Sequence, residues 1–251
     1  MKNIIHPQIS KINVYPSLEE TARAAAEFTI NIVLKNPQAI ITYATGNTMI
    51  PVYQKITEKI SKKEVDFSKT KAFHLDEYYP CDPKADYGFV NYLYKYVFGP
   101  FKIKKTNIFI LNGLVKNPKL EADRYNLLLK KSPVDLAILG IGPGSHIGFN
   151  EQRTPFDTQT HLAKLSKETI FRDQKERGQD TPTTALTQGI SNILSAKKII
   201  LVAYGENKGE YLKPALWEKI NSQYPASALR LQGQKVIIFI DQAAASKASK
   251  E

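Results

Sequence analysis

VDLAILGIGPGSHIGFNE, residues 134–151, runs from an apolar segment directly into a glycine-rich turn. The segment 134–139 is typical of a buried strand. Four glycines then fall within positions 140–148, although glycine loses more backbone entropy on folding than any other residue. We expect such a turn where the backbone approaches a ligand or holds a side chain at an unusual angle. His146 and Glu151 lie on this turn and are the first candidates for catalysis.

Similar apolar, β-branched runs recur along the chain and alternate with helical patterns. Strands are predicted at 39–45, 70–75, 107–111, 134–140, 198–203 and 235–240. Helices are predicted at 18–34, 49–61, 87–98, 120–130, 184–194 and 208–220. Nearly continuous apolar strands that alternate with helices favour a parallel sheet covered on both faces, so the predicted fold class is α/β.

The composition indicates one soluble domain. No internal repeat or Pro/Gly/Ser-rich linker divides the 251 residues, so we predict a single domain over 1–251. A single cysteine, Cys81, excludes an intramolecular disulfide and fits a reducing compartment. No secretion signal is evident, and no run approaches the roughly 20 apolar residues that span a bilayer. We therefore expect a cytoplasmic protein with no membrane partner and a fraying tail at 243–251.

The net charge of +11 has three explanations. The lysines are scattered rather than clustered with aromatic residues in one stripe, which favours a lysine-rich soluble surface. A phosphorylated small substrate is the second explanation. A nucleic-acid partner is the third, and we expect none.

Ligands of open parallel sheets bind beyond the carboxyl ends of the strands, and three predicted strands end in polar or glycine-rich sequence. The first is followed by Thr45-Gly46-Asn47-Thr48, ahead of the helix predicted from residue 49. Hydroxyls and a glycine at a helix N-terminus suit an anion, because free N–H groups and the positive end of the dipole meet there. A plain N-cap by Asn47 or Thr48 explains the same residues equally well.

The second strand ends in FHLDEY, residues 73–78, which places two carboxylates side by side. Strand alternation puts His74 and Asp76 on one face and Glu77 on the other. A carboxylate that faces a cleft can serve as a general base if its pKa is tuned. The alternative, in which Asp76 caps the following turn and Glu77 forms a salt bridge, fits this motif alone slightly better.

The third strand leads into the glycine-rich turn. A lone histidine after a strand is more often structural than catalytic, but a carboxylate that accepts the imidazole N–H of His146 would fix its tautomer and raise its basicity. Ser145 lies in Gly-Ser-His rather than in the Gly-x-Ser-x-Gly of a serine nucleophile. The four histidines show no metal-ligand spacing, so no metal site is predicted.

Two further segments can supply cations. Lys208 lies near the start of a predicted helix, where a positive charge opposes the helix dipole. A phosphate contact and an exposed lysine are equally good explanations of it. Arg172, Lys175 and Arg177 lie in a polar stretch before Pro182 and fit either a second cationic contact or a solvated loop.

Taken together, these motifs resemble the glucosamine-6-phosphate deaminase/isomerase family over about residues 18–241. The specific part is His-Ile-Gly-Phe-Asn-Glu at 146–151. The supporting motifs are Thr-Gly-Asn-Thr at 45–48, Leu-Asp-Glu-Tyr at 75–78, Ala-Leu-Thr-x-Gly at 185–189 and Pro-Ala-Ser-x-Leu at 225–229. The length also looks similar to the galactosamine-6-phosphate isomerase branch. The resemblance implies a Rossmann-like, doubly wound, mostly parallel sheet with helices on both faces.

The resemblance also implies an activity, the deaminating isomerisation of a hexosamine 6-phosphate to a ketose 6-phosphate and ammonia, without a metal or redox cofactor. Asp76 would move a proton from C2 to C1 of the sugar, and His146, held in orientation by Glu151, would open the pyranose ring. The residues expected to bind the sugar phosphate are Thr45, Gly46, Asn47, Thr48, Arg172 and Lys208.

The chain departs from the family pattern beside the histidine. Members usually carry Asp or Asn and then Gly there, where this chain has Gly144 and Ser145. Two alternatives stay open. A 6-phosphogluconolactonase-like hydrolase is disfavoured by Asp76 and Glu151 together, and a catalytically weak sugar-phosphate sensor is kept open by Gly144. The sequence chooses neither between gluco and galacto substrates nor between a monomer and a homo-oligomer.

Overall fold

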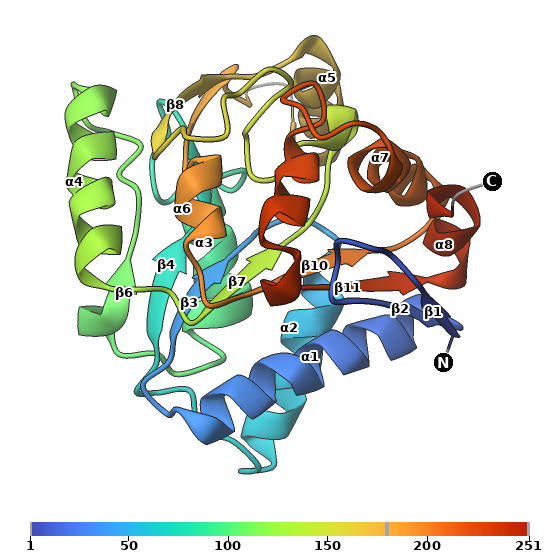
Figure 1. The fold of residues 1–251 in the computed structure, drawn as a ribbon. Coiled ribbons are helices and arrows are strands. Elements are labelled where there is room, and N and C mark those ends of the chain that lie inside the picture. Colours follow the sequence, from blue (N-terminus) through green and yellow to red (C-terminus); the bar gives the residue numbers. More distant parts are fainter. Residues whose placement is uncertain (1, 179–180, 250–251) are drawn as a thin grey trace.

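The computed structural model describes residues 2–178 and 181–249 and is built around a sheet of eight strands (Figure 1). The strand order is β1-β2-β11-β10-β7-β3-β4-β6, and every pairing is parallel except that of β1 with β2. The strands are β1 (Lys2–Ile4), β2 (Lys11–Tyr15), β3 (Ile40–Tyr43), β4 (Lys71–His74), β6 (Ile108–Phe109), β7 (Leu136–Leu139), β10 (Lys198–Ala203) and β11 (Val236–Asp241).

Helices surround this sheet. They are α1 (Leu18–Lys35), α2 (Ile50–Ser61), α3 (Phe89–Leu93), α4 (Pro118–Lys131), α5 (Lys167–Arg177), α6 (Ile190–Leu194), α7 (Glu206–Trp217) and α8 (Gln242–Ala248). α1 begins at Ser17, whose side chain accepts the N–H of Glu20, and its buried alanine-rich face packs against α2 and the strands β10 and β11. The predicted Rossmann-like, doubly wound, mostly parallel sheet is confirmed.

The direction of winding reverses between β3 and β7. From β3 the chain continues outward to β4 and β6, whereas from β7 it continues on the other side to β10 and β11. β3 and β7 are themselves paired, with Ile41 opposite Leu136. The carboxyl ends of these two strands therefore flank a crevice, which is where open α/β sheets bind ligands.

A second, smaller sheet contradicts one part of the sequence prediction. Residues 184–194 were expected to form one helix, but Thr184–Thr187 is strand β9, and the helix α6 begins only at Ile190. β9 pairs antiparallel with β5 (Asp76–Tyr78) and with β8 (His161–Lys164). A short apolar run fits a strand or a helix equally well. Residues 184–187 form a strand because they pair with β5 and β8, two segments that are distant in sequence.

Other predicted boundaries also change. The helix expected at 87–98 divides into α3 and a π-helix over Tyr94–Phe98, and α5 forms in the polar stretch before Pro182. The tail expected to fray instead forms α8, with Ala244 and Ala248 buried and Asp241 capping its first turn. Residues 250 and 251 of that tail lie outside the described residues.

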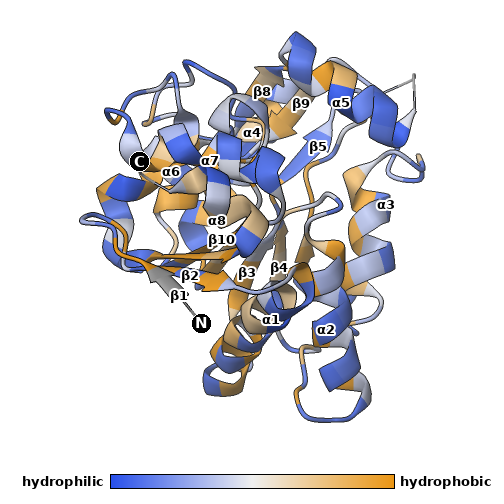
Figure 2. Ribbon diagram, turned by 90° about the vertical axis from the view of Figure 1, so that its right-hand side faces the viewer, coloured by the Kyte–Doolittle hydropathy of each residue, from blue (hydrophilic) through white to orange (hydrophobic). Residues whose placement is uncertain are grey.

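The small sheet sits at one end of the molecule, together with α5 and away from α1 and α2 (Figure 2). It holds its own apolar cluster, in which Tyr78 packs against Phe89 and Phe149 with ring centroids 4.6 and 5.6 Å away. This second cluster fixes α5 and the small sheet beyond the carboxyl ends of the main strands. Across the described ranges, no helix has the length and apolar character needed to cross a membrane.

Candidate active site

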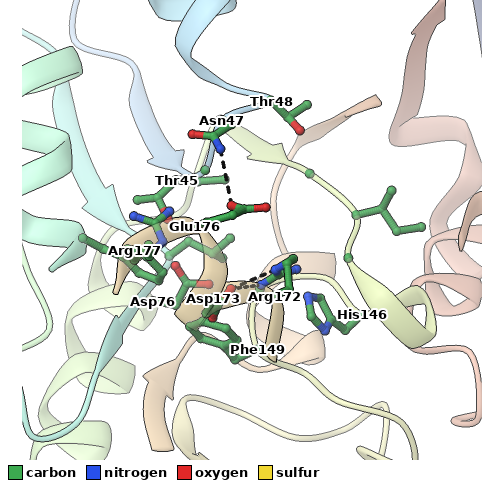
Figure 3. A pocket seen from close by; sticks show the side chains of 18 of the residues that line it. Thr45, Asn47, Thr48, Asp76, His146, Phe149, Arg172, Asp173, Glu176 and Arg177 are labelled. Carbon is green, nitrogen blue, oxygen red and sulfur yellow. Dashed lines mark hydrogen bonds and ion pairs between the residues drawn. The ribbon is translucent and has the colours of Figure 1, made fainter. Parts of the chain in front are cut away.

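A pocket lies at the crevice between the ends of β3 and β7 (Figure 3). Its lining comes from the loops after β3 and β7, from the start of β5, and from α5 and α7. The fold thus brings together side chains that lie more than a hundred residues apart. The predicted site residues that line it are Thr45, Gly46, Asn47, Thr48, Asp76, His146, Arg172 and Lys208. Glu151 lies behind His146 and completes the set.

The loop after β3 leads into the N-terminus of α2. Gly46 adopts φ +103°, a left-handed conformation that glycine adopts without strain, and its carbonyl accepts the hydroxyl of Tyr92 at 2.8 Å. The N-cap of α2 is Met49, whose side chain makes no capping hydrogen bond. The alternative of a plain N-cap by Asn47 or Thr48 is therefore wrong. Beside the pocket, the positive end of the helix dipole is available to an anion.

Lys208 is a pocket residue rather than an exposed lysine. It lies in the first turn of α7, and its Nζ donates to the carbonyl of Ile141 at 2.6 Å. Burial, together with the positive charge of Arg172, lowers the pKa of Lys208 to about 8. An anionic ligand would offset both effects, so the position favours an anion in the pocket.

The polar stretch before Pro182 is the helix α5 rather than a solvated loop. The guanidinium of Arg172 donates twice to one carboxylate oxygen of Asp173, at 2.8 and 2.6 Å. The other oxygen of Asp173 accepts the hydroxyl of Tyr78 at 2.7 Å, which ties the helix to the small sheet. Arg177 lies over the ring of Phe89, with its guanidinium carbon 4.6 Å from the ring centroid.

Asp76 and Glu77 have different surroundings, as the strand alternation predicted. Asp76 lines the pocket, and its Oδ1 has no hydrogen-bond partner among the described residues. Burial and the neighbouring charge of Glu77 raise the pKa of Asp76 to about 8. Glu77 instead accepts the backbone N–H groups of Tyr78, Phe89 and Val90. The alternative with Asp76 as the cap and Glu77 in a salt bridge is therefore wrong.

The glycine-rich turn presents the imidazole of His146 to the pocket. A short 3₁₀ turn precedes it, with φ +63° at Gly144 and +61° at Ser145. The backbone at Gly142 approaches the ring so closely that a Cβ there would lie 1.9 Å from Nε2. The presence of glycine at position 142, despite its entropic cost, therefore has a steric explanation, because only glycine leaves room for the imidazole.

His146 and Glu151 form a buried pair. Nδ1 of His146 lies 3.4 Å from Oε2 of Glu151, and Oε1 of the same carboxylate accepts the N–H of Ser166 at 3.3 Å. Burial lowers the pKa of His146, an effect that the bond to Glu151 opposes and that the charges of Arg172 and Lys208 reinforce. Burial alone would raise the pKa of Glu151, but its hydrogen bonds outweigh this and lower it. A neutral imidazole beside a carboxylate results.

Several pocket residues were missed by the sequence interpretation. Asp173 and Glu176 line the pocket from α5, and Phe89 and Phe149 supply its apolar wall. The sequence does contain residues that predict the boundaries of α5. Ser166 caps it, Glu168 is in its first turn and Gly178 follows its end, which is the usual order of helix boundary residues. In the part of the chain that the structure describes, no group of three or more His, Cys, Asp or Glu side chains could hold a metal.

Comparisons with known proteins agree with this architecture. The family model described as glucosamine-6-phosphate isomerases/6-phosphogluconolactonase matches residues 16–238. A glucosamine-6-phosphate deaminase of Clostridium botulinum (strain Langeland) is 37% identical over 240 residues, which cover 94% of this chain and 98% of the relative. The corresponding protein of Clostridium novyi (strain NT) is 35% identical, covering 94% of this chain and 99% of its own.

Solved structures give the same result. A monomeric glucosamine-6-phosphate deaminase superposes with a TM-score of 0.88 at 31% identity, covering 94% of this chain and 99% of the other. A 6-phosphogluconolactonase from Trypanosoma brucei superposes with a TM-score of 0.75 at 16% identity over 95% and 98% of the two chains, which shows the shared fold alone. The chain belongs to the enzyme family of glucosamine-6-phosphate isomerases and 6-phosphogluconolactonases, and the resemblance seen in its motifs is confirmed.

Proposed function

We propose that this enzyme converts a hexosamine 6-phosphate into a ketose 6-phosphate and ammonia. The observation that carries the proposal is the composition of the pocket. Cationic Lys208 and Arg172 share it with a carboxylate, Asp76, whose Oδ1 is unpaired, and with the His146–Glu151 pair. Glucosamine 6-phosphate is the first substrate to test, because the curated relatives are named glucosamine-6-phosphate deaminases.

The phosphate is proposed to lie at the end of the pocket formed by residues 45–48. The N-terminus of α2 offers its dipole there, and Lys208 offers a charge held by the carbonyl of Ile141. Arg172 uses its Nε and one terminal nitrogen to donate hydrogen bonds to Asp173, so the other terminal nitrogen has N–H groups that can bind the ligand. With the phosphate bound in this position, the sugar ring would face Asp76 and His146.

The chemistry is proposed to begin with ring opening. Neutral His146 accepts the proton of the anomeric hydroxyl and passes it to the ring oxygen, so the C1 aldehyde forms as the C1–O5 bond breaks and the imidazole is neutral again. Glu151 holds Nδ1, which leaves Nε2 beside Gly142 as the nitrogen available to the substrate. A neutral imidazole suits this step, since a protonated one could not act as the base.

Isomerisation and deamination would follow. Asp76 removes the proton from C2, the electrons of that bond form the C1=C2 double bond, and the C1 oxygen takes up a proton from water. Return of the proton from Asp76 to C1 gives a C2=NH2+ iminium. Water adds to C2, ammonia leaves, and one proton is released as the C2 ketone forms. An unpaired oxygen on a carboxylate with a pKa of about 8 suits a base that must give its proton back.

A lactonase of the same fold is the second enzyme candidate. Hydrolysis of a lactone needs no base at C2, so it would leave Asp76 unexplained. A sugar-phosphate sensor would leave the whole His146–Glu151 arrangement unexplained. The proposal also includes galactosamine 6-phosphate as the alternative substrate, a cytoplasmic location and a homo-oligomer.

The purified enzyme tests the proposal directly. With glucosamine 6-phosphate or galactosamine 6-phosphate it should release ammonia and a ketose 6-phosphate in equal amounts. Asp76→Asn should abolish the release of ammonia and leave binding of the sugar phosphate within a few-fold of wild type, measured by calorimetry, because the amide cannot accept the C2 proton. Absence of turnover, together with a higher melting temperature in hexose 6-phosphate, would instead support the sensor.

A further inference from the structure

The imidazole of His146 has a second polar neighbour besides Glu151. The hydroxyl oxygen of Thr169 lies 3.5 Å from Nδ1. Thr169 is in the first turn of α5, and its side chain is fully buried. A buried hydroxyl needs partners for its oxygen and for its hydrogen, so the contacts around Thr169 can be assigned.

The hydroxyl of Ser166 is one hydrogen-bond partner of the Thr169 hydroxyl. Ser166 donates its hydroxyl hydrogen to the Thr169 oxygen at 2.9 Å, and the backbone N–H of Thr169 donates back to the Ser166 oxygen at 3.2 Å. The hydrogen of the Thr169 hydroxyl therefore points away from Ser166. On the other side of the Thr169 oxygen are Nδ1 of His146, at 3.5 Å, and the carboxylate of Glu151, whose pKa Thr169 helps to lower.

Glu151 alone holds the imidazole loosely. The distance of 3.4 Å from Nδ1 to Oε2 is long for a hydrogen bond to a charged carboxylate, which is usually about 2.7–2.9 Å. Residue 144, on the turn before the imidazole, is a glycine and contributes no side chain. The orientation of the imidazole at Nδ1 thus depends on two groups at the start of α5. One is the Thr169 hydroxyl, and the other is the Ser166 N–H, which donates to Glu151.

We propose that Thr169 is a positioning residue for the proposed ring-opening step, and that its hydroxyl fixes the plane and tautomer of His146 through the Nδ1–Glu151 edge. The inference rests on the proposed function. Thr169 and Arg172 are three residues apart and share a face of α5. One placement of α5 therefore positions both the imidazole and a cationic contact of the same pocket.

Hydroxyl removal tests the proposal. Thr169→Val keeps the shape and removes the hydroxyl, whereas Thr169→Ser keeps the hydroxyl. Thr29→Val is the matched control, because Thr29 is also a fully buried helical threonine, bonded to the carbonyl of Ala25 in α1. With glucosamine 6-phosphate we expect Thr169→Val to lower kcat about tenfold with KM within about twofold, and the other two variants to stay within about twofold of wild type.

The second readout needs no substrate. In ligand-free protein labelled with ¹⁵N-histidine, Thr169→Val should shift the His146 ring resonances toward a mixture of tautomers, and Thr169→Ser should restore them. Unchanged kcat and ring resonances in Thr169→Val would overturn the proposal and leave Thr169 a packing residue. If valine prevents folding, Thr169→Ala gives the same two readouts. A wild-type enzyme that releases no ammonia refutes the proposed function, whereas the ring resonances still decide the role of Thr169.

Discussion

Asp76, the proposed base, is surrounded by charges of both signs, and these charges set the pH at which it is ionised. Burial and Glu77 raise its pKa to about 8, while Arg177 and Arg172 oppose that rise. A base must be deprotonated, so the acid limb of kcat/KM should rise with pH until Asp76 is ionised, and loss of the Lys208 charge, whose pKa is also about 8, should lower kcat/KM at higher pH. The cation that opposes the rise most strongly is Arg177, which lies over the ring of Phe89 and lines the pocket.

Arg177→Met should therefore move the acid limb of the kcat/KM profile to higher pH. Loss of a nearby positive charge disfavours the carboxylate, which raises the pKa of Asp76 further above its usual value. At pH 7 the variant should be slower than wild type, and the two should converge at alkaline pH. Lys175→Met is the control, since Lys175 is exposed on the same helix and does not line the pocket. An acid limb that stays in place would show that Arg177 does not tune Asp76.

At the scale of an element, α5 carries most of what the sequence did not predict about the site. Its polar composition fits a solvated loop as well as a helix, because its buried residues are Thr169 and Asp173 rather than an apolar stripe. The contacts that hold it come from other segments: Tyr78 binds Asp173, and Asn47 donates to Glu176 at 3.4 Å. No local pattern reports such contacts, so the helix could be identified only by its capping residues.

Glu176 places a negative charge where the phosphate is proposed to bind. It lines the pocket, contacts Asn47 in the loop after β3 and interacts electrostatically with Lys208 and Arg172 (Figure 3). Glu176→Gln should bind inorganic phosphate about three- to tenfold more tightly by calorimetry, because a repulsive charge is removed while the contact to Asn47 can persist. Glu168→Gln, exposed at the other end of α5, should bind phosphate as wild type does. Weaker binding in Glu176→Gln would mean that the carboxylate supports the ligand.

At the scale of the whole molecule, the C-terminal helix supports the helix that carries Lys208. α7 and α8 pack so closely that a Cβ on Gly209 would lie 2.1 Å from the backbone oxygen of Ala244. The indole N–H of Trp217 donates to the carbonyl of Ala248 at 2.7 Å, which joins the far ends of the two helices. The segment 243–251 was predicted to fray because its composition is small and polar. Small side chains are what this close approach requires.

Gly209→Ala should therefore destabilise the protein. An added methyl group against backbone has no flexible neighbour to displace, so we expect the free energy of unfolding to fall by about 1–3 kcal/mol in denaturant titrations. Gly140→Ala is the matched control, since the nearest atom to its Cβ would be the end of the Met49 side chain at 3.6 Å. If the two variants were equally stable, the α7–α8 contact would be looser than the structure indicates.

The sequence by itself determined the main sheet and the chemical groups of the candidate site. Its short, nearly continuous apolar runs alternate with helical patterns, as is typical of buried parallel strands, and polar residues follow several of these runs along the chain. The tertiary structure alone decided that β5, β8 and β9 form a second sheet and that α5 covers the pocket. It also decided that Glu77 accepts the first N–H groups of α3, while Oδ1 of Asp76 has no hydrogen-bond partner among the residues that the structure describes. These outcomes depend on pairings between segments far apart in sequence. The stability of such pairings depends on both partners, so the sequence of one segment does not predict it.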